Sequence, residues 1–165
     1  MGLDMYLHKK TYVKNWDHND KKDHYEITIK KGGEIYNEIQ INRITEIVEE
    51  VAYWRKANHI HNWFVNNVQG GKDDCGEYYV TEDDITKLIN TCEKVLGSLE
   101  DSYDKKTDTY KNTSVAERLL PRGSGFFFGS IIYDKWYADD LRDTIEQLQP
   151  LLEEKTGDFY YQSSW

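Results

Sequence analysis

The segment 51–68 concentrates side chains that could bind a small ligand: Trp54, Arg55, Asn58, His61 and Asn62. An arginine offers a bidentate fork for a phosphate or carboxylate. Asparagine amides can read the edge of a base or a sugar, and tryptophan offers a stacking face. His61 could also donate or accept a proton. These residue types together predict a pocket for a small anionic ligand derived from a nucleotide.

A helix from Arg43 to Val68 is expected to position these side chains. Its apolar stripe consists of four residues at helical spacing: Ile44, Ile47, Val48 and Val51. After Val51, polar side chains continue the same stripe. Two interpretations stay open: the helix leaves the core near Trp54 and its polar residues face solvent, or these residues line a cavity. A buried polar stripe would need hydrogen-bond partners.

A second candidate region runs from Arg122 to Tyr137. Glycines at 123 and 125 would allow close backbone approach, and Arg122 could grip an anion. Asp134 is most simply a helix N-cap and only secondarily an acceptor for a ribose hydroxyl. Trp136 and Tyr137 could stack on a base. A turn that enters a strand is the simpler reading of this region.

Metal and nucleophile chemistry are less well supported. His59 and His61 lie two positions apart, so on a helix they point in different directions and cannot share a metal. Cys75 follows two aspartates, which raise rather than lower a thiol pKa. We therefore expect neither a metal nor a cofactor. If the protein is an enzyme, His61 would be the general acid or base, oriented by Asp74 or Asp134.

Charge and composition narrow the class of function. The 165 residues include 21 basic and 30 acidic side chains, a net charge of −9, and 14% aromatic residues. Disordered chains of high charge are poor in aromatics, and nucleic-acid polymers require clustered positive charge. The N-terminus lacks a signal-like apolar run, and no segment approaches 18 apolar residues. We expect a cytoplasmic protein that binds neither membranes nor nucleic-acid polymers.

Periodicity predicts one α+β domain over residues 1–165, with a mainly antiparallel or mixed sheet and about three helices. Strands are expected at 3–13, 24–35 with a turn at Gly32-Gly33, 76–80, 123–133 and 158–165. Besides 43–68, helices are expected at 81–99, with Thr81 as N-cap, and at 134–155, with a kink at Pro150. Residues 97–114 are polar and are expected to form an exposed loop or insert.

Several phrases resemble a family of small phage and bacterial proteins that mostly carry no assigned function. They are YWRKANHIHNWFV (53–65), DDCGEYYV (73–80), GFFFGSIIYDKWY (125–137) and DFYYQSSW (158–165). A looser analogy, based on size and the combination of rings with arginine, is to phage anti-defence proteins that sequester nucleotide signals. No shared motif carries that analogy.

The leading hypothesis is therefore a phage-type protein that sequesters a small nucleotide-derived anion, for example an immune signal of the host, in whose cytoplasm it would act. Small sequestering proteins often build pockets between subunits, so a homo-oligomer is expected. Two alternatives stay open. The protein could be an enzyme that cleaves such a nucleotide, with His61 as its acid or base. It could instead be an acidic inhibitor that binds another protein through polyanion mimicry.

Overall fold

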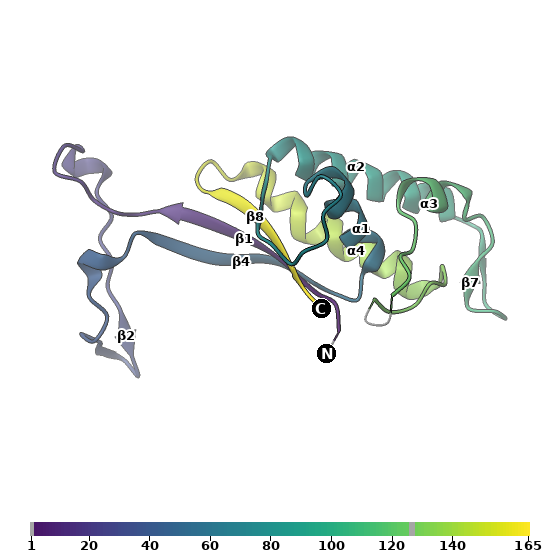
Figure 1. The fold of residues 1–165 in the computed structure, drawn as a ribbon, viewed down its shortest axis with the longest axis horizontal. Helices are drawn as coiled ribbons and strands as arrows, with labels where there is room; N and C mark the ends of the chain where they lie inside the picture. Colours follow the sequence, from purple (N-terminus) through teal and green to yellow (C-terminus); the bar gives the residue numbers. More distant parts are fainter. Residues whose placement is uncertain (1, 126–127) are drawn as a thin grey trace.

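The centre of the fold is a four-stranded antiparallel sheet in the order β4-β1-β8-β5. This computed structural model describes residues 2–125 and 128–165. The strands are β1 (Asp4–Tyr12), β4 (Glu46–Arg55), β5 (Tyr78–Val80) and β8 (Asp158–Ser164). The C-terminal strand β8 lies inside the sheet, between β1 and β5. Both ends of the chain therefore help to hold the sheet together (Figure 1).

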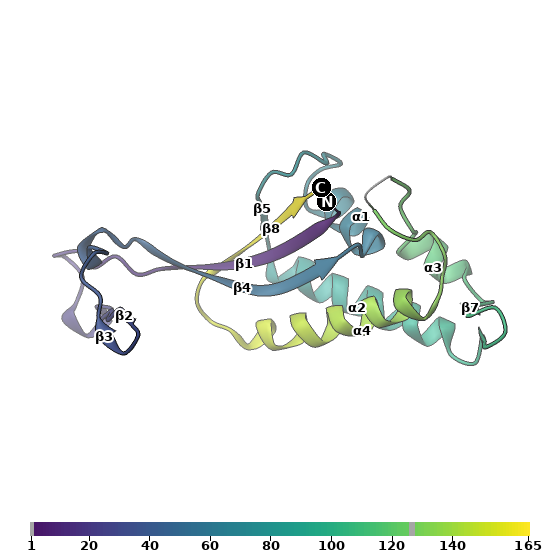
Figure 2. The same cartoon turned by 90° about the horizontal axis from the view of Figure 1, so that it is seen from below.

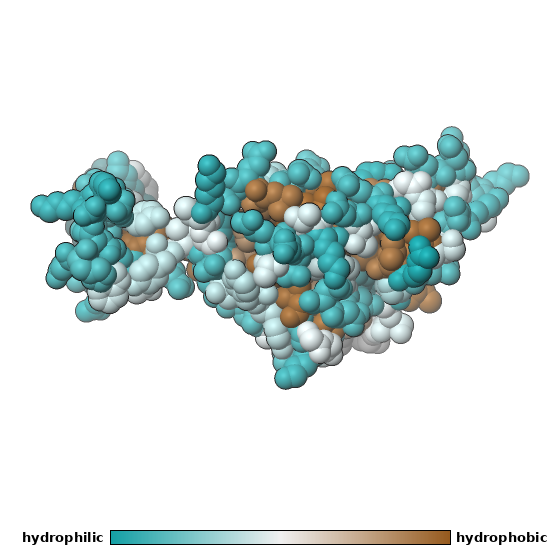
Figure 3. Space-filling view, turned by 90° about the horizontal axis from the view of Figure 1, so that it is seen from above, coloured by the Kyte–Doolittle hydropathy of each residue, from teal (hydrophilic) through white to brown (hydrophobic). Residues whose placement is uncertain are grey.

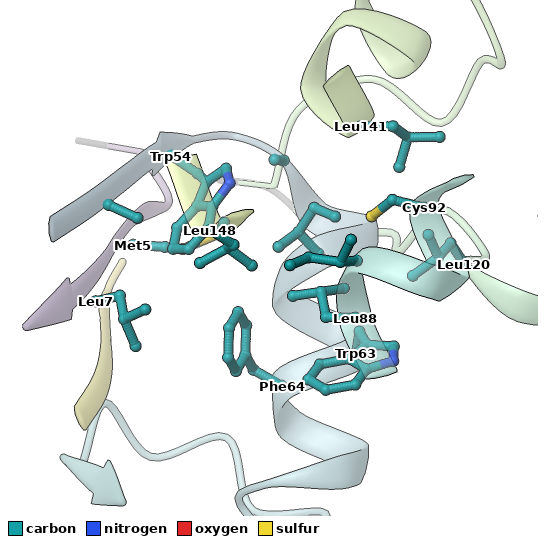
Figure 4. Close-up of a cluster of buried hydrophobic side chains, with 14 of the residues drawn as sticks. Met5, Leu7, Trp54, Trp63, Phe64, Leu88, Cys92, Leu120, Leu141 and Leu148 are labelled. Carbon is teal, nitrogen blue, oxygen red and sulfur yellow. The ribbon is translucent and has the colours of Figure 1, made fainter. Parts of the chain in front are cut away.

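Helices cover one face of the sheet. They are α1 (Asn58–Asn67), α2 (Glu82–Leu99) and α4 (Lys135–Leu148), with the short α3 (Ser114–Leu119) beside α2. Along β1 and β8, alternate residues are buried, as expected for strands with one covered face. The covered side chains pack with those of the helices into one apolar core, which Figure 4 shows around Trp54, Phe64 and Leu88.

The two long helices begin with the caps that the sequence predicts. Thr81 and Asp84 form a capping box at the start of α2. Asp134 accepts a hydrogen bond from the Tyr137 amide at the start of α4. After Leu148 the chain changes to a 3₁₀ helix, Gln149–Glu153, because Pro150 cannot continue the α-helical hydrogen bonding.

Residues 10–48, called the arm below, project away from the helices (Figures 1 and 2). The outer ends of β1 and β4 form a two-stranded ribbon. It leads to 3₁₀ turns at Lys21–Asp23 and Ile41–Arg43 and to the hairpin of β2 (Lys30–Lys31) and β3 (Glu34–Ile35). Figure 3 shows the arm as a mostly hydrophilic knob joined to the body by a narrow waist. Val13 is the only buried residue within this stretch of described residues.

The expected helix from Arg43 to Val68 is wrong in its first half. Residues Glu46–Arg55 are the edge strand β4, and the helix begins only at Asn58, after Lys56 in a left-handed conformation with φ 60°. The register with β1 pairs Met5 with Trp54 and Tyr6 with Tyr53. A helical wheel over this segment therefore groups side chains that do not share a face.

Three further expectations change. The expected strand 24–35 is wrong over residues 24–29, and only the short hairpin of β2 and β3 forms around its glycine turn. Residues 123–133 form no strand in the part that the structure describes, and residues 126 and 127 lie outside the described residues. The expected insert 97–114 begins inside α2 and continues as a short hairpin of β6 (Tyr103–Asp104) and β7 (Thr109–Tyr110). The α+β class with a mainly antiparallel sheet is confirmed. Among the described residues, none of the helices combines the length and apolar character needed to span a membrane.

Candidate functional site

A groove of about 490 Å³ lies between the inner half of the edge strand β4 and helix α4. Strand β4 contributes Tyr53, Trp54 and Arg55. Helix α4 contributes Trp136, Asp139, Asp140, Asp143 and Gln147. The groove thus combines aromatic rings with three carboxylates, all placed by two regular elements.

Two side-chain hydrogen bonds fix the distance between β4 and α4. The amide of Tyr53 donates to Gln147 Oε1 at 2.8 Å, which satisfies a backbone group on the outer side of the edge strand. The indole of Trp54 donates from Nε1 to Thr144 Oγ1 at 2.9 Å. Trp136, by contrast, is 72% exposed. The two walls of the groove are therefore held together by hydrogen bonds, whereas the Trp136 side chain in its lining is largely exposed.

A buried charged cluster lies behind the groove. The Arg122 side chain is only 5% exposed, and its guanidinium lies 3.4 Å from Asp134 and 4.0 Å from Asp140. Arg122 Nε also donates to the carbonyl of Ile132, and the guanidinium stacks over the Tyr137 ring at 5.0 Å. The donors of this arginine are thus directed at groups of the protein itself.

His59 completes this cluster from α1. It is fully buried, its ring lies against Tyr137 with centroids 4.4 Å apart, and Nε2 is 3.9 Å from Asp140 Oδ2. Neither ring nitrogen has a hydrogen-bond partner among the described residues. Burial, reinforced by the nearby Arg122 charge, places the pKa of His59 well below its usual 6.5. The ring is therefore neutral at physiological pH.

Asp140 belongs to both the groove and the buried cluster. Burial raises the pKa of Asp140 from 3.8 to about 7, although Arg122 opposes the shift; Asp143, Asp134 and Asp139 add to it. Its side chain remains 27% exposed. A carboxyl group that titrates near neutral pH at a groove wall can exchange a proton or bind a cation.

The groove carries more negative than positive charge. Asp139 pairs with Arg142 on the same helix at 2.8 Å, whereas Asp143 has no ion pair among the described residues. Arg55, with a side chain 64% exposed, stands at the rim and lies 3.8 Å from Asp4. Arg55 is the only basic residue in the lining that the structure describes. This charge distribution favours a cation over an anion.

The structure distributes the residues singled out in the sequence over two places. Trp54, Arg55 and Trp136 line the groove, and Arg122, Asp134 and Tyr137 lie in the cluster behind it. Asn58, His61 and Asn62 lie elsewhere, because the chain turns between β4 and α1. Their predicted role in ligand binding stays a prediction.

Asn58 holds the loop that was expected to be a strand. Its Nδ2 donates to the carbonyls of Phe128 and Ser130, and its Oδ1 accepts from the amide of Gly123. Asn62 lies against the same loop, since a Cβ atom at Gly123 would come within 2.7 Å of its Nδ2. Asn58 therefore satisfies backbone groups that would otherwise need a strand partner.

His61 is also fully buried, but polar atoms lie close to both of its nitrogens. Nδ1 is 2.8 Å from the hydroxyl of Tyr161, and Nε2 is 3.1 Å from Asp73 Oδ2. Asp73, rather than the expected Asp74, is thus its acidic neighbour. Asp74 instead accepts hydrogen bonds from the Gly76 amide and the Tyr78 hydroxyl, which lower the pKa of Asp74.

The sequence reading missed the acidic half of the groove, Asp139, Asp140 and Asp143, together with Tyr53, Gln147 and His59. Asp139 and Asp143 stand four positions apart on a predicted helix, so their shared face was readable. That this face meets a strand edge depends on packing between distant segments. Among residues 2–125 and 128–165, no three or more His, Cys, Asp or Glu side chains are arranged so that they could hold a metal ion.

Comparisons with protein-family models, with curated proteins and with solved structures gave no match. The resemblance to small phage and bacterial proteins therefore stays a hypothesis. Functional inference depends on the groove itself.

Proposed function

We propose that this protein is a binding protein whose groove between β4 and α4 captures a cationic group of a partner. This is the acidic-inhibitor alternative of the sequence analysis, with its contact surface assigned to Asp139, Asp140 and Asp143. The observation that carries the proposal is the lining itself, three aspartates beside an exposed indole and one peripheral arginine. An ammonium or guanidinium would find carboxylates and a ring face together.

The raised pKa of Asp140 supports the binding of a cation in this groove. Its raised pKa reflects a carboxylate that is poorly solvated and close to other aspartates. A bound cation would offset the cost of this burial and the repulsion from the other aspartates, because it supplies an opposite charge where water is partly excluded. A phosphate in the same place would add to the repulsion.

The test is isothermal titration calorimetry of the full chain at about pH 8 with agmatine, which carries a guanidinium and an ammonium. We expect saturable binding that weakens at high salt, because the attraction is electrostatic. Asp143→Asn should weaken it about tenfold, which corresponds to about 1.4 kcal/mol. Glu146→Gln, an exposed acid on the same helix outside the lining, is the matched control and should leave it unchanged.

A second pair of variants tests the ring contact. Trp136→Ala should weaken agmatine binding about fivefold, because a cation over an indole contributes roughly 1 kcal/mol. Trp16→Ala removes another exposed indole, on the arm, and should have no effect.

The nucleotide hypothesis retains one favourable observation, since Arg55 and two tryptophans line the same groove. AMP and ADP-ribose are therefore titrated in parallel. Tighter binding of either nucleotide than of agmatine, lost in Arg55→Gln and kept in Asp143→Asn, would overturn the cation proposal and favour the sequestration of an anion.

A further inference from the structure

The outer half of β4 is an open sheet edge. Among the described residues, strand β4 pairs only with β1, and every residue from Glu46 to Glu50 is exposed. In Figure 1 this half of the strand extends past the helices, so no helix stands beside it. The bond between Tyr53 and Gln147 occupies the edge only at the inner end. An open edge of this kind presents backbone donors and acceptors to another chain.

Of the usual devices that protect a sheet edge, lysine and proline are missing here, whereas a register shift and three glutamates are present. Between residues 46 and 54 there is neither a lysine nor a proline. A register shift opposite Leu7 and His8 makes β4 irregular at Val51. The regular part of the edge that another strand could pair with is therefore residues 46–50. Within that stretch, Ile47 is 42% and Val48 is 54% exposed. An incoming strand could bury both of these side chains.

The negative charge of this strand edge indicates what kind of chain could pair with it. Glu46, Glu49 and Glu50 stand within five residues, and only Glu49 has an ion pair among the described residues, with Lys9 at 3.5 Å. A second copy paired through the same edge would place glutamates near glutamates, which is unfavourable. A strand with lysine or arginine side chains would meet complementary charges instead.

We propose that an extended, basic segment of a partner protein adds to the sheet as a fifth strand beside residues 46–50 of β4. At about 3.3 Å per residue, the same segment reaches the inner end of β4 within a few positions. There a basic side chain enters the groove lined by Asp139, Asp140 and Asp143. The groove contact rests on the proposed function, whereas the strand addition rests on the open edge alone.

The experiment measures backbone hydrogen exchange of the full chain with a ten-residue peptide that alternates lysine and valine. We expect slower exchange within residues 46–50, since strand addition occupies their outward amides. The control peptide has the same sequence and charge but is N-methylated at every residue, so it cannot donate backbone hydrogen bonds. It should bind at least about tenfold more weakly and give no protection.

A charge reversal tests the choice of partner. The double variant Glu46→Lys, Glu50→Lys should lose about tenfold or more in affinity for the lysine peptide and should gain affinity for a glutamate–valine peptide. Glu93→Lys with Glu100→Lys makes the same charge change at two exposed positions, one in α2 and one directly after its C-terminal end, and is the matched control.

The outcomes separate the two proposals. Equal binding of both peptides, or protection only outside 46–50, overturns the strand addition, while agmatine titration of the groove decides the proposed function independently. A dimer in sedimentation, with residues 46–50 already protected before peptide is added, would instead identify a second copy as the occupant and overturn the basic partner.

Discussion

His59 and His61 stand two residues apart on α1, and both are fully buried, yet their surroundings are opposite in kind. His61 lies between the Tyr161 hydroxyl and the Asp73 carboxylate, at 2.8 and 3.1 Å. Asp140 Oδ2 lies 3.9 Å from His59 Nε2, and neither nitrogen of His59 has a hydrogen-bond partner among the described residues. His61 therefore has one hydrogen-bonded nitrogen, Nδ1, and a carboxylate close to Nε2, although Nε2 itself forms no hydrogen bond among the described residues; His59 has neither a hydrogen bond nor a carboxylate this close.

The difference suggests a structural role for His61 and a place beside the candidate site for His59. Buried polar groups with partners rigidify a fold, and the contacts of His61 join α1 to β8 and to the loop that follows α1. Buried polar groups without partners cost free energy and are rare outside functional sites. His59 lies behind Asp140, the carboxyl group that the buried cluster shares with the groove.

The largest effect is expected from the same substitution made at both histidines. His61→Leu leaves the Tyr161 hydroxyl and the Asp73 carboxylate without their neighbour, and should lower the free energy of unfolding by about 2–3 kcal/mol. His59→Leu removes two unpartnered nitrogens, and should change it by less than about 1 kcal/mol. Urea denaturation followed by circular dichroism measures both. Equal losses at the two sites would contradict the comparison.

A second prediction concerns the pH dependence of stability. The folded-state pKa of Asp140 is raised to about 7, so the folded protein binds this proton more tightly than the unfolded chain. Stability from this group is present at low pH and is lost as pH rises from about 4 through about 7. Relative to Asp140→Asn, the wild-type protein should lose roughly 2 kcal/mol over that interval, less than the full linkage value because the side chain touches water.

Comparison with Asp140→Asn at each pH isolates this carboxyl from His59. The lowered pKa of His59 acts in the opposite sense, since stability falls as pH drops below about 6.5 and the unfolded chain takes up the proton. Urea midpoints of both proteins across about pH 5 to 8 supply the data. A difference between them that does not change with pH would show that Asp140 titrates normally.

The sequence predicted those elements for which local signals agree. In α2, the capping residues Thr81 and Asp84 precede an apolar spacing that repeats over the whole helix, and both features are local. Strand β4 was not predicted, because the strand that stabilises it by pairing, β1, lies about forty residues earlier in the sequence. Its outer half is exposed on both faces, so its apolar residues carry no two-residue period, whereas their spacing imitates a helix.

The same limit applies to the site. A helical period predicts Trp54 and Arg55 as site residues, whereas they lie on a strand and reach the groove because that strand packs beside α4. Asp139 and Asp143 have the four-residue spacing of one face of a helix, which the sequence alone does not distinguish from a solvated face. Only the packing of α4 against the edge of β4 makes that face one wall of a groove, and such packing is not encoded in either segment alone.

A third prediction links the groove to the same carboxyl group. Because Asp140 must be ionised to attract a cation, agmatine should bind about five- to tenfold more tightly at about pH 8 than at about pH 6. The ratio should fall to nearly one in Asp140→Asn. Calorimetry in two buffers of different ionisation enthalpy counts the protons released. If the affinity of the wild-type protein for agmatine does not change with pH, the ionisation of Asp140 does not contribute to binding.

The prediction with the smallest effect concerns Trp165, which contacts the acidic neighbour of His61. Trp165 Nε1 donates to Asp73 Oδ1 at 3.0 Å, so it holds the carboxylate that faces His61. Trp165→Phe keeps a ring beside Phe128 but removes this donor, and should cost about 0.5–1 kcal/mol. Trp16→Phe removes an equivalent donor to the Tyr12 hydroxyl on the exposed arm, also at 3.0 Å, and should cost less than about 0.5 kcal/mol.

The double variant Trp165→Phe, His61→Leu decides whether the two contacts on Asp73 act together. If the indole holds Asp73 in place for His61, the loss from Trp165→Phe should shrink by at least about 0.5 kcal/mol once the imidazole is gone. Additive losses would mean that Trp165 stabilises the end of β8 alone. In that case Trp165 does not act through His61, and His61 differs from His59 only by its contacts with Tyr161 and Asp73.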